Sequence, residues 1–136
     1  MLIEEIMNKT IVTVEMDDTL KLVKDIFDHA KFHHLMVIEH DKLFGILSDR
    51  DLLKALSPNI GTAAETMRDT ASLNKKVHQI MTRKPFTLTA DADIYDAINL
   101  FNENAVSCIP IINKQHKPVG ILSWRDILKA IADERG

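Results

Sequence analysis

One series of apolar and polar patterns occurs twice along the chain. Each occurrence begins with a short run of β-branched or aromatic residues, which is typical of a strand. A polar, acidic segment follows, and after it apolar residues recur every three or four positions, which indicates an amphipathic helix. Two more apolar runs flank a polar turn, and a second helical stretch ends the series. The pattern therefore predicts strand–helix–strand–strand–helix in each half.

The predicted elements occupy equivalent places in the two halves. Predicted strands cover 11–14, 35–38 and 43–47 in the first half, and 86–89, 109–112 and 119–122 in the second. The apolar faces of the predicted helices comprise Leu20, Val23, Phe27 and Ala30; Leu52, Leu53 and Leu56; Ile94, Ala97, Phe101 and Ala105; and Ile127, Leu128 and Ile131. Between the halves, a segment with Pro58 and Gly61 predicts a connection with a helical turn at about Ala63–Arg68.

An internal duplication explains this symmetry. Ile6-Met7 is followed six residues later by Thr13, and Ile80-Met81, 74 positions further on, is followed in the same way by Thr87. The segment that begins Gly45-Ile46-Leu47-Ser48 matches the segment that begins at Gly120, with nine identical residues in eleven. We therefore divide the chain into a first repeat at 1–56, a linker at 57–75 and a second repeat at 76–136.

The duplication predicts an α+β fold of two βαββα units. One unit has three short strands with a single apolar face, and nothing within the unit covers that face. A second copy supplies the cover, so the repeats are expected to pack around a pseudo-two-fold axis.

Composition narrows the class of protein. The 136 residues include 17 Lys and Arg against 20 Asp and Glu, a net charge of −3, so the chain lacks the basic excess of a nucleic-acid-binding domain. No apolar run reaches the roughly 18 residues of a membrane span, and the first residues lack a signal-peptide pattern. The single cysteine, Cys108, excludes an internal disulfide and favours a reducing compartment. These features predict a cytoplasmic protein with no membrane or nucleic-acid partner.

The two doubled motifs resemble those of tandem cystathionine-β-synthase (CBS) domains, the pair known as a Bateman module. The resemblance extends over nearly the whole chain and includes Val106-Ser107-Cys108-Ile109-Pro110 before the second-repeat strand. It implies a regulatory pair of βαββα repeats that binds AMP, ADP, ATP or S-adenosylmethionine in clefts between the repeats. It also implies a homodimer, a separate effector protein, no obligatory cofactor and no catalytic residues. The alternative is a ligand-independent interaction or oligomerisation module, and an enzyme is disfavoured because no nucleophile elbow or Gly-rich phosphate loop is present.

The doubled Ser-x-x-Asp sequence has two interpretations. At a helix start, a Ser hydroxyl can donate to a phosphate, and an Asp three residues later can accept from the two hydroxyls of a ribose. The same spacing also forms a capping box without any ligand, which is the simpler interpretation of the spacing alone. The resemblance favours a binding cleft.

The resemblance further implies two composite clefts, each with apolar walls for adenine. One would comprise Ile46, Ser48 and Asp51 with Thr82, Phe86, Thr87, Val106, Ser107 and Ile109. The other would comprise Ile121, Ser123 and Asp126 with Asn8, Val12, Thr13, Phe32, His33 and Leu35.

Several residues near these positions leave alternatives open. Met36 stands where the second repeat has Pro110, and the adjacent His33 and His34 either contact phosphate or narrow the cleft. His29 and His33 have the i, i+4 spacing of zinc ligands, but no third ligand accompanies them, so we predict no metal site. Trp124 replaces Asp49 of the first repeat and either stacks on a base, contacts a second subunit or packs locally. Nearby basic residues either pair with phosphate or are solvated: Lys9, Arg50, Arg83, Lys84 and Arg125.

Overall fold

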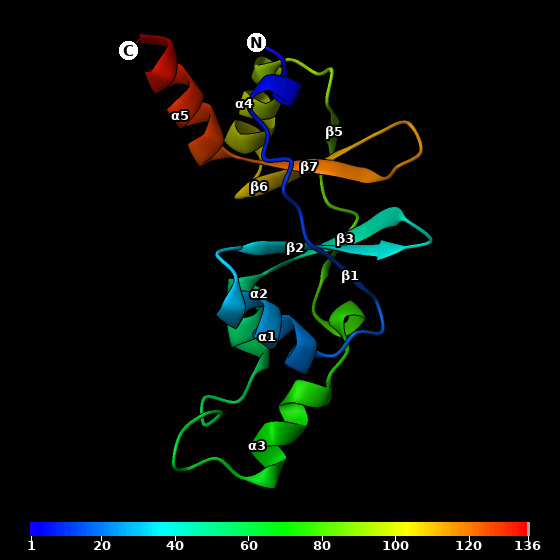
Figure 1. Cartoon of the computed structure of the whole chain (residues 1–136), viewed down its shortest axis with the longest axis vertical. Helices are drawn as coiled ribbons and strands as arrows, with labels where there is room; N and C mark the ends of the chain where they lie inside the picture. The colour runs from blue at the N-terminus through cyan, green and yellow to red at the C-terminus, as the bar shows by residue number, and fades with distance from the viewer. Residues whose placement is uncertain (136) are drawn as a thin grey trace. The chain divides into compact units, whose positions relative to one another are not determined.

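Two sheets organise the chain, and each is the centre of a separate unit (Figure 1). The computed structural model describes residues 1–135, with Arg135 as backbone only; Gly136, the last residue of the predicted second repeat, lies outside the described residues. Unit 1 comprises Met1–Ile11, Asp41–Leu43 and the chain from Lys84 onward, and unit 2 comprises Val12–His40 and Phe44–Arg83. Both units combine a small sheet with helices, so the predicted α+β class is confirmed.

Unit 2 is built on a four-stranded sheet in the order β1-β2-β3-β4. The strands are β1 (Thr13–Glu15), β2 (His34–Glu39), β3 (Lys42–Ser48) and β4 (Thr82–Arg83). β1 runs parallel to β2, and β4 pairs antiparallel with β3. β4 was not anticipated from the sequence, because two exposed polar residues carry no apolar pattern.

Helices α1 (Leu20–His29) and α2 (Asp49–Ala55) lie on the same side of this sheet (Figure 1). The Thr19 hydroxyl caps α1 by accepting from the Leu22 amide, and the helix buries Leu20 and Val23. Alternating strand residues and the inner helix faces meet in one apolar cluster. Its buried members are Val14, Leu20, Val23, Leu35, Val37, Leu47, Leu52, Val77 and Met81.

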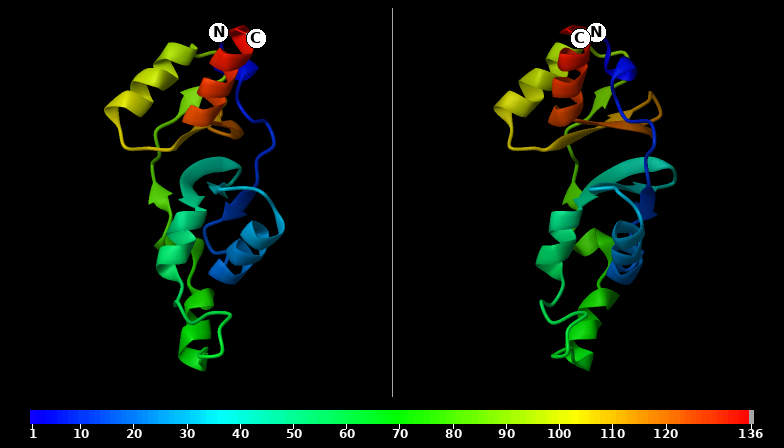
Figure 2. Two further views of the ribbon diagram at one scale, coloured as in Figure 1. Left: turned by 90° about the vertical axis from the view of Figure 1, so that its left-hand side faces the viewer. Right: turned by 60° about the vertical axis from the view of Figure 1, so that its left-hand side comes forward.

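The connection between the repeats holds a short helix, α3 (Met67–Ala71), followed by the 3-10 turns η2 (Ser72–Asn74) and η3 (Val77–Gln79). The expected helical turn at 63–68 is wrong in position, because Thr66 and Asp69 form a capping box that starts the helix at Met67. Figure 2 agrees with Figure 1 that α3 lies beyond α1 and α2, away from the sheet of unit 2.

Unit 1 repeats this plan on a three-stranded sheet in the order β5-β6-β7. Its elements are η1 (Ile3–Glu5), β5 (Leu88–Thr89), α4 (Ile94–Glu103), β6 (Cys108–Ile112), β7 (Pro118–Ser123) and α5 (Trp124–Arg135). β5 and β6 are parallel, whereas β6 and β7 are antiparallel. The Asp93 carboxylate caps α4 by accepting from the Tyr95 amide at 3.1 Å, as the acidic segment predicts. The buried core comprises Ile3, Ile94, Ala97, Ile109, Ile111, Leu122 and Ile127.

The compact units do not coincide with the sequence repeats, because the segment that starts each repeat joins the sheet of the other. Asn8, from the first repeat, exchanges two backbone hydrogen bonds of 2.9 Å with Ile121 of β7. In the same way, Thr82 of the second repeat pairs with Ile46 of β3. Each unit is therefore completed by a strand-like segment from the other repeat.

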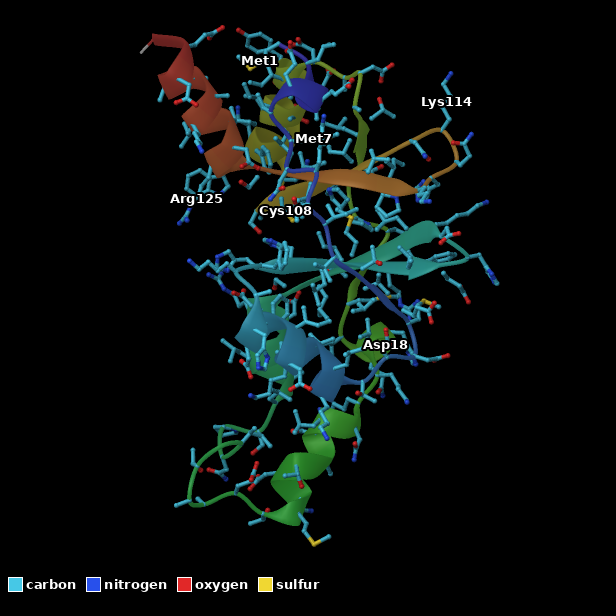
Figure 3. The ribbon with its side chains drawn as sticks, in the orientation of Figure 1. Met1, Met7, Asp18, Cys108, Lys114 and Arg125 are labelled. Atoms are coloured by element: carbon cyan, nitrogen blue, oxygen red, sulfur yellow. The ribbon has the colours of Figure 1, made fainter. Side chains whose placement is uncertain are left out.

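Two glycines make these pairings possible. A Cβ atom on Gly45 would lie 2.7 Å from the Met81 sulfur and 2.8 Å from the Thr82 carbonyl oxygen. A Cβ atom on Gly120 would lie 2.6 Å from the Met7 sulfur and 3.2 Å from the Asn8 carbonyl oxygen. Figure 3 shows Met7 on the N-terminal segment beside β7. The Ile-Met start of each repeat thus packs on the Gly-Ile-Leu-Ser strand of the other.

We expect Gly45→Ala to lower the free energy of unfolding more than Gly120→Ala. The methyl group at position 45 would lie 2.8 Å from a backbone oxygen that cannot move without disturbing the β3–β4 pairing. At position 120 the backbone oxygen is 3.2 Å away, and the closer atoms belong to the flexible Met7 side chain. Overpacking costs about 1–3 kcal/mol, so we place Gly45→Ala near the upper and Gly120→Ala near the lower end. Urea unfolding followed by circular dichroism measures both. A larger loss for Gly120→Ala would contradict this explanation.

Candidate functional site

In unit 2, the Ser-x-x-Asp sequence lies where β3 ends and α2 begins. The Ser48 hydroxyl accepts a hydrogen bond from the Asp51 amide at 3.0 Å, and the Ser48 amide donates to Asp51 Oδ2 at 2.9 Å. These reciprocal bonds form a capping box. We call this segment, Ser48–Asp51, the unit 2 turn.

The equivalent segment of unit 1, Ser123–Asp126, joins β7 to α5 and is called the unit 1 turn. The Asp126 amide donates to the Ser123 hydroxyl at 3.2 Å. Asp126 Oδ2 accepts from the Ser123 amide at 2.8 Å and from the Ser123 hydroxyl at 3.0 Å. The capping-box interpretation is therefore confirmed in both repeats. A carboxylate has about four acceptor positions, so a capping Asp retains acceptor capacity for ligand hydroxyls.

Both predicted sets have members in unit 2. Ile46, Ser48 and Asp51 of the first set lie there together with Thr82, which pairs with Ile46. Five members of the second predicted set also belong to unit 2: Val12, Thr13, Phe32, His33 and Leu35.

The other members of both sets belong to unit 1. Asn8 of the second set lies against Ile121, two residues before Ser123 in the same strand. The rest of the first set also belongs to this unit: Phe86, Thr87, Val106, Ser107 and Ile109. Ile109 of β6 pairs with Leu122 of β7, which places the start of β6 next to the unit 1 turn.

A pair of ionisable side chains that the sequence pattern does not predict borders the unit 2 turn. His33 Nδ1 lies 2.9 Å from Asp49 Oδ2, and the Asp49 amide donates to the His33 carbonyl at 3.0 Å. The resemblance places His33 in the set that contains Asp126, whereas its imidazole contacts the first residue of α2. The signal available in the sequence was the change from Asp49 to Trp124 between the repeats.

His34, at the start of β2, is half-buried in the same cluster. Burial lowers the pKa of the His34 imidazole below its usual range, and the neighbouring His33 acts in the same direction. The carboxylates of Asp49 and Asp51 oppose this effect and raise the pKa of His34. One imidazole therefore senses the charges of both acidic residues of the unit 2 turn.

The equivalent region of unit 1 holds different chemistry. Burial raises the pKa of the Cys108 thiol to about 12, so Cys108 is a neutral, poorly nucleophilic thiol near pH 7. Trp124 is 46% exposed, and the Arg125 guanidinium lies 5.5 Å from its ring centroid. Figure 3 shows Arg125 projecting outward from the first turn of α5.

The zinc alternative finds no support in the described part of the chain. His29 Nδ1 lies 2.7 Å from the Asp25 carbonyl oxygen, on its own helix. Across residues 1–134, whose side chains are described, no three His, Cys, Asp or Glu residues are grouped as metal ligands would be.

None of the described helices combines the length and apolar character needed to cross a bilayer.

The sequence and the fold now identify the family. The CBS domain profile matches residues 3–58 and 77–133, so the chain belongs to the CBS domain family. Protein MJ1232 of Methanocaldococcus jannaschii, which is uncharacterized, is 29% identical over 124 residues. That match covers 91% of this chain and 37% of the relative, so the chain spans little more than a third of that protein.

Solved structures share the fold. The CBS domain pair of protein MJ0100, in complex with 5′-methylthioadenosine and S-adenosyl-L-methionine, has a TM-score of 0.78, 24% identity and 98% coverage of both chains. CBSX2 in complex with AMP has a TM-score of 0.81 and 21% identity, with coverage of 99% of this chain and 98% of that one. The resemblance noted in the sequence, a tandem CBS pair, is confirmed.

We expect acidification to destabilise the protein through His34. Because the folded-state pKa of His34 is lowered, its stabilising contribution is complete above the unfolded-state pKa, near 6.5, and is lost as the pH falls through the folded-state value. The His34→Gln variant lacks this contribution, so its unfolding free energy should fall less between pH 8 and pH 5. Urea unfolding across this range gives the two slopes. Parallel slopes would mean that His34 is not the group responsible.

Proposed function

We propose that this chain is a regulatory CBS pair that binds an adenosine-containing ligand, AMP, ADP, ATP or S-adenosylmethionine, and reports its concentration to an effector protein. The observation that carries the proposal is the duplicated Ser-x-x-Asp turn. In both units it places a serine hydroxyl and a carboxylate at a helix start that follows an apolar strand. Two similar CBS structures hold AMP or 5′-methylthioadenosine with S-adenosylmethionine.

The proposed roles follow from donor and acceptor chemistry. Ser48 donates to a phosphate or another 5′ acceptor, and Ser123 does so once its hydroxyl hydrogen turns from Asp126 toward the ligand. Asp51 and Asp126 accept from the two ribose hydroxyls. The apolar residues of the predicted sets contact adenine, and neighbouring backbone groups supply its hydrogen bonds. These roles require binding without catalysis, and no cofactor takes part.

The exchanged segments give the ligand a route to the rest of the chain. Ile46 pairs with Thr82 only two residues before Ser48, and Ile121 pairs with Asn8 two residues before Ser123. A ligand that shifts either turn therefore also displaces the segment paired with that strand. The chain continues from this segment into the other unit. Such a ligand regulates only to the extent that its affinity differs between the two conformations.

Isothermal titration calorimetry with AMP, ADP, ATP and S-adenosylmethionine tests the proposal. We expect at least one ligand to bind, and Asp51→Asn or Asp126→Asn to weaken it by about 10- to 100-fold, the loss expected for a hydrogen bond to a charged group. Asparagine keeps a side-chain oxygen for the cap, so circular dichroism should show both variants folded. Absence of binding at about millimolar ligand would contradict the proposal.

A groove on unit 2 favours a second role, as a homodimer through the helices. It has a volume of about 430 Å³ between α1 and α2, and Leu53 beside it is 73% exposed. Its lining is mainly apolar and comprises Lys24, Phe27, Asp28, Ala30, Lys31, Phe32, His33, Asp49, Leu52, Leu53 and Leu56. Both signs of charge occur at its edge, which suits a self-complementary contact between two copies.

We expect Leu53→Glu to shift the protein from dimer to monomer, because a carboxylate would enter an apolar contact. Met67→Glu is the matched control: Met67 is 90% exposed but lies on α3, outside the groove. Sedimentation velocity should show a dimer for the wild type and for Met67→Glu only. A monomeric wild type, or equal effects of the two substitutions, would contradict a dimer through this groove.

A further inference from the structure

The two Ser-x-x-Asp turns are nearly identical in sequence but differ in the ionisable groups around them. The first residue of the helix is Asp49 in unit 2 and Trp124 in unit 1. The residues at the start of the middle strand also differ: His33 and His34 in the first repeat correspond to Ser107 and Cys108 in the second.

In unit 2 these differences assemble a titratable cluster. The Asp49 carboxylate contacts the His33 imidazole at 2.9 Å, and both side chains are partly exposed, at 44% and 74%. The charges of His33, Asp49 and Asp51 all act on His34, so each of these three groups lies within electrostatic range of that imidazole. The cluster includes two acidic side chains, Asp49 and Asp51.

In unit 1 the same four positions contain only one acidic side chain, Asp126. Burial keeps Cys108 a neutral thiol, and Ser107 and Trp124 carry no charge. Trp124 instead lies against the Arg125 guanidinium. This turn therefore lacks the second carboxylate that Asp49 adds to the unit 2 turn.

A charge at position 49 acts on any group that the unit 2 turn binds. Asp49 adjoins Ser48, the proposed phosphate donor, so a phosphate on that hydroxyl lies within the screening length of about 8 Å at physiological salt. A carboxylate at this distance repels a phosphate but not a neutral thioether, and it attracts a sulfonium.

Other charges around His33 do not cancel this effect. Lys24 and Asp28 of α1 line the same groove but form an ion pair of 2.6 Å with each other. Lys31, between α1 and β2, is exposed and lines the groove as well. Charges exposed to solvent interact weakly, so Lys31 offsets the Asp49 charge only in part.

We propose that the two turns select adenosine ligands of different charge. The unit 2 turn prefers a ligand without negative charge at its 5′ position, because the Asp49 carboxylate lies beside it. The unit 1 turn, which has Trp124 in place of this carboxylate, prefers 5′-phosphorylated adenosine. This inference rests on the proposed function and adds to it a charge preference for each site.

The test compares AMP with 5′-methylthioadenosine, which share adenosine and differ at the 5′ position. Calorimetry on full-length Asp126→Asn reports the unit 2 turn, and on full-length Asp51→Asn the unit 1 turn. At about pH 8 we expect the unit 2 turn to favour 5′-methylthioadenosine, and the unit 1 turn to favour AMP, by about tenfold each, the order of one like-charge interaction near a protein surface.

Matched substitutions assign the effect to the named groups. In the Asp126→Asn background, Asp49→Asn should raise AMP affinity about tenfold at pH 8 and leave 5′-methylthioadenosine binding unchanged. In the Asp51→Asn background, Trp124→Asp should lower AMP affinity by a similar factor.

The outcomes separate this inference from the function on which it rests. If neither ligand binds the wild type, both the proposed function and the charge selection fail. If ligands bind but the two turns show the same ratio of AMP to 5′-methylthioadenosine affinity, the adenosine-binding function stands and the charge selection is overturned. An Asp49→Asn variant with unchanged AMP affinity overturns it as well.

Discussion

The close approach of a strand-like segment to a glycine is the interaction on which this fold depends. Each unit is completed only when the Ile-Met segment of the opposite repeat reaches its sheet, and Gly45 and Gly120 leave the space for Met81 and Met7. Antiparallel pairing then holds the segments, at Ile46–Thr82 and Asn8–Ile121. Because the exchange is reciprocal, neither repeat has all the residues of a complete unit. The fold therefore requires both repeats.

The same pairings position the candidate site. In each repeat, the glycine is followed directly by the paired isoleucine, and the serine and aspartate of the turn come shortly after it. The capping box orients both side chains in the folded chain. In the proposed function, capping and binding use the same two residues, since a carboxylate can accept several hydrogen bonds at once, and this orientation reduces the entropy lost on binding. The simple interpretation of the spacing and the functional one are compatible.

The repeats have diverged around a preserved motif. The turns retain serine and aspartate, whereas the residues beside them became a histidine–aspartate pair in unit 2 and an arginine–tryptophan contact in unit 1. These neighbours alter the local charge without touching the shared geometry. A duplicated module can in this way keep one turn geometry and still have a different local charge at each turn, because electrostatic effects act over several ångströms beyond the contacting atoms.

Periodicity along the chain was sufficient to predict the strand–helix–strand–strand–helix order and the α+β class, because those patterns depend on which local face is buried. It also located both Ser-x-x-Asp turns and the resemblance to CBS domains. It misplaced the start of α3, where the cap formed by Thr66 and Asp69 decided the boundary, and it gave no sign of β4. The exchange of segments between units and the contact of His33 with Asp49 appeared only in the tertiary structure. Pairings of this kind join residues that are distant in the sequence, and they are decided by which backbone edges and side chains the packed core brings together.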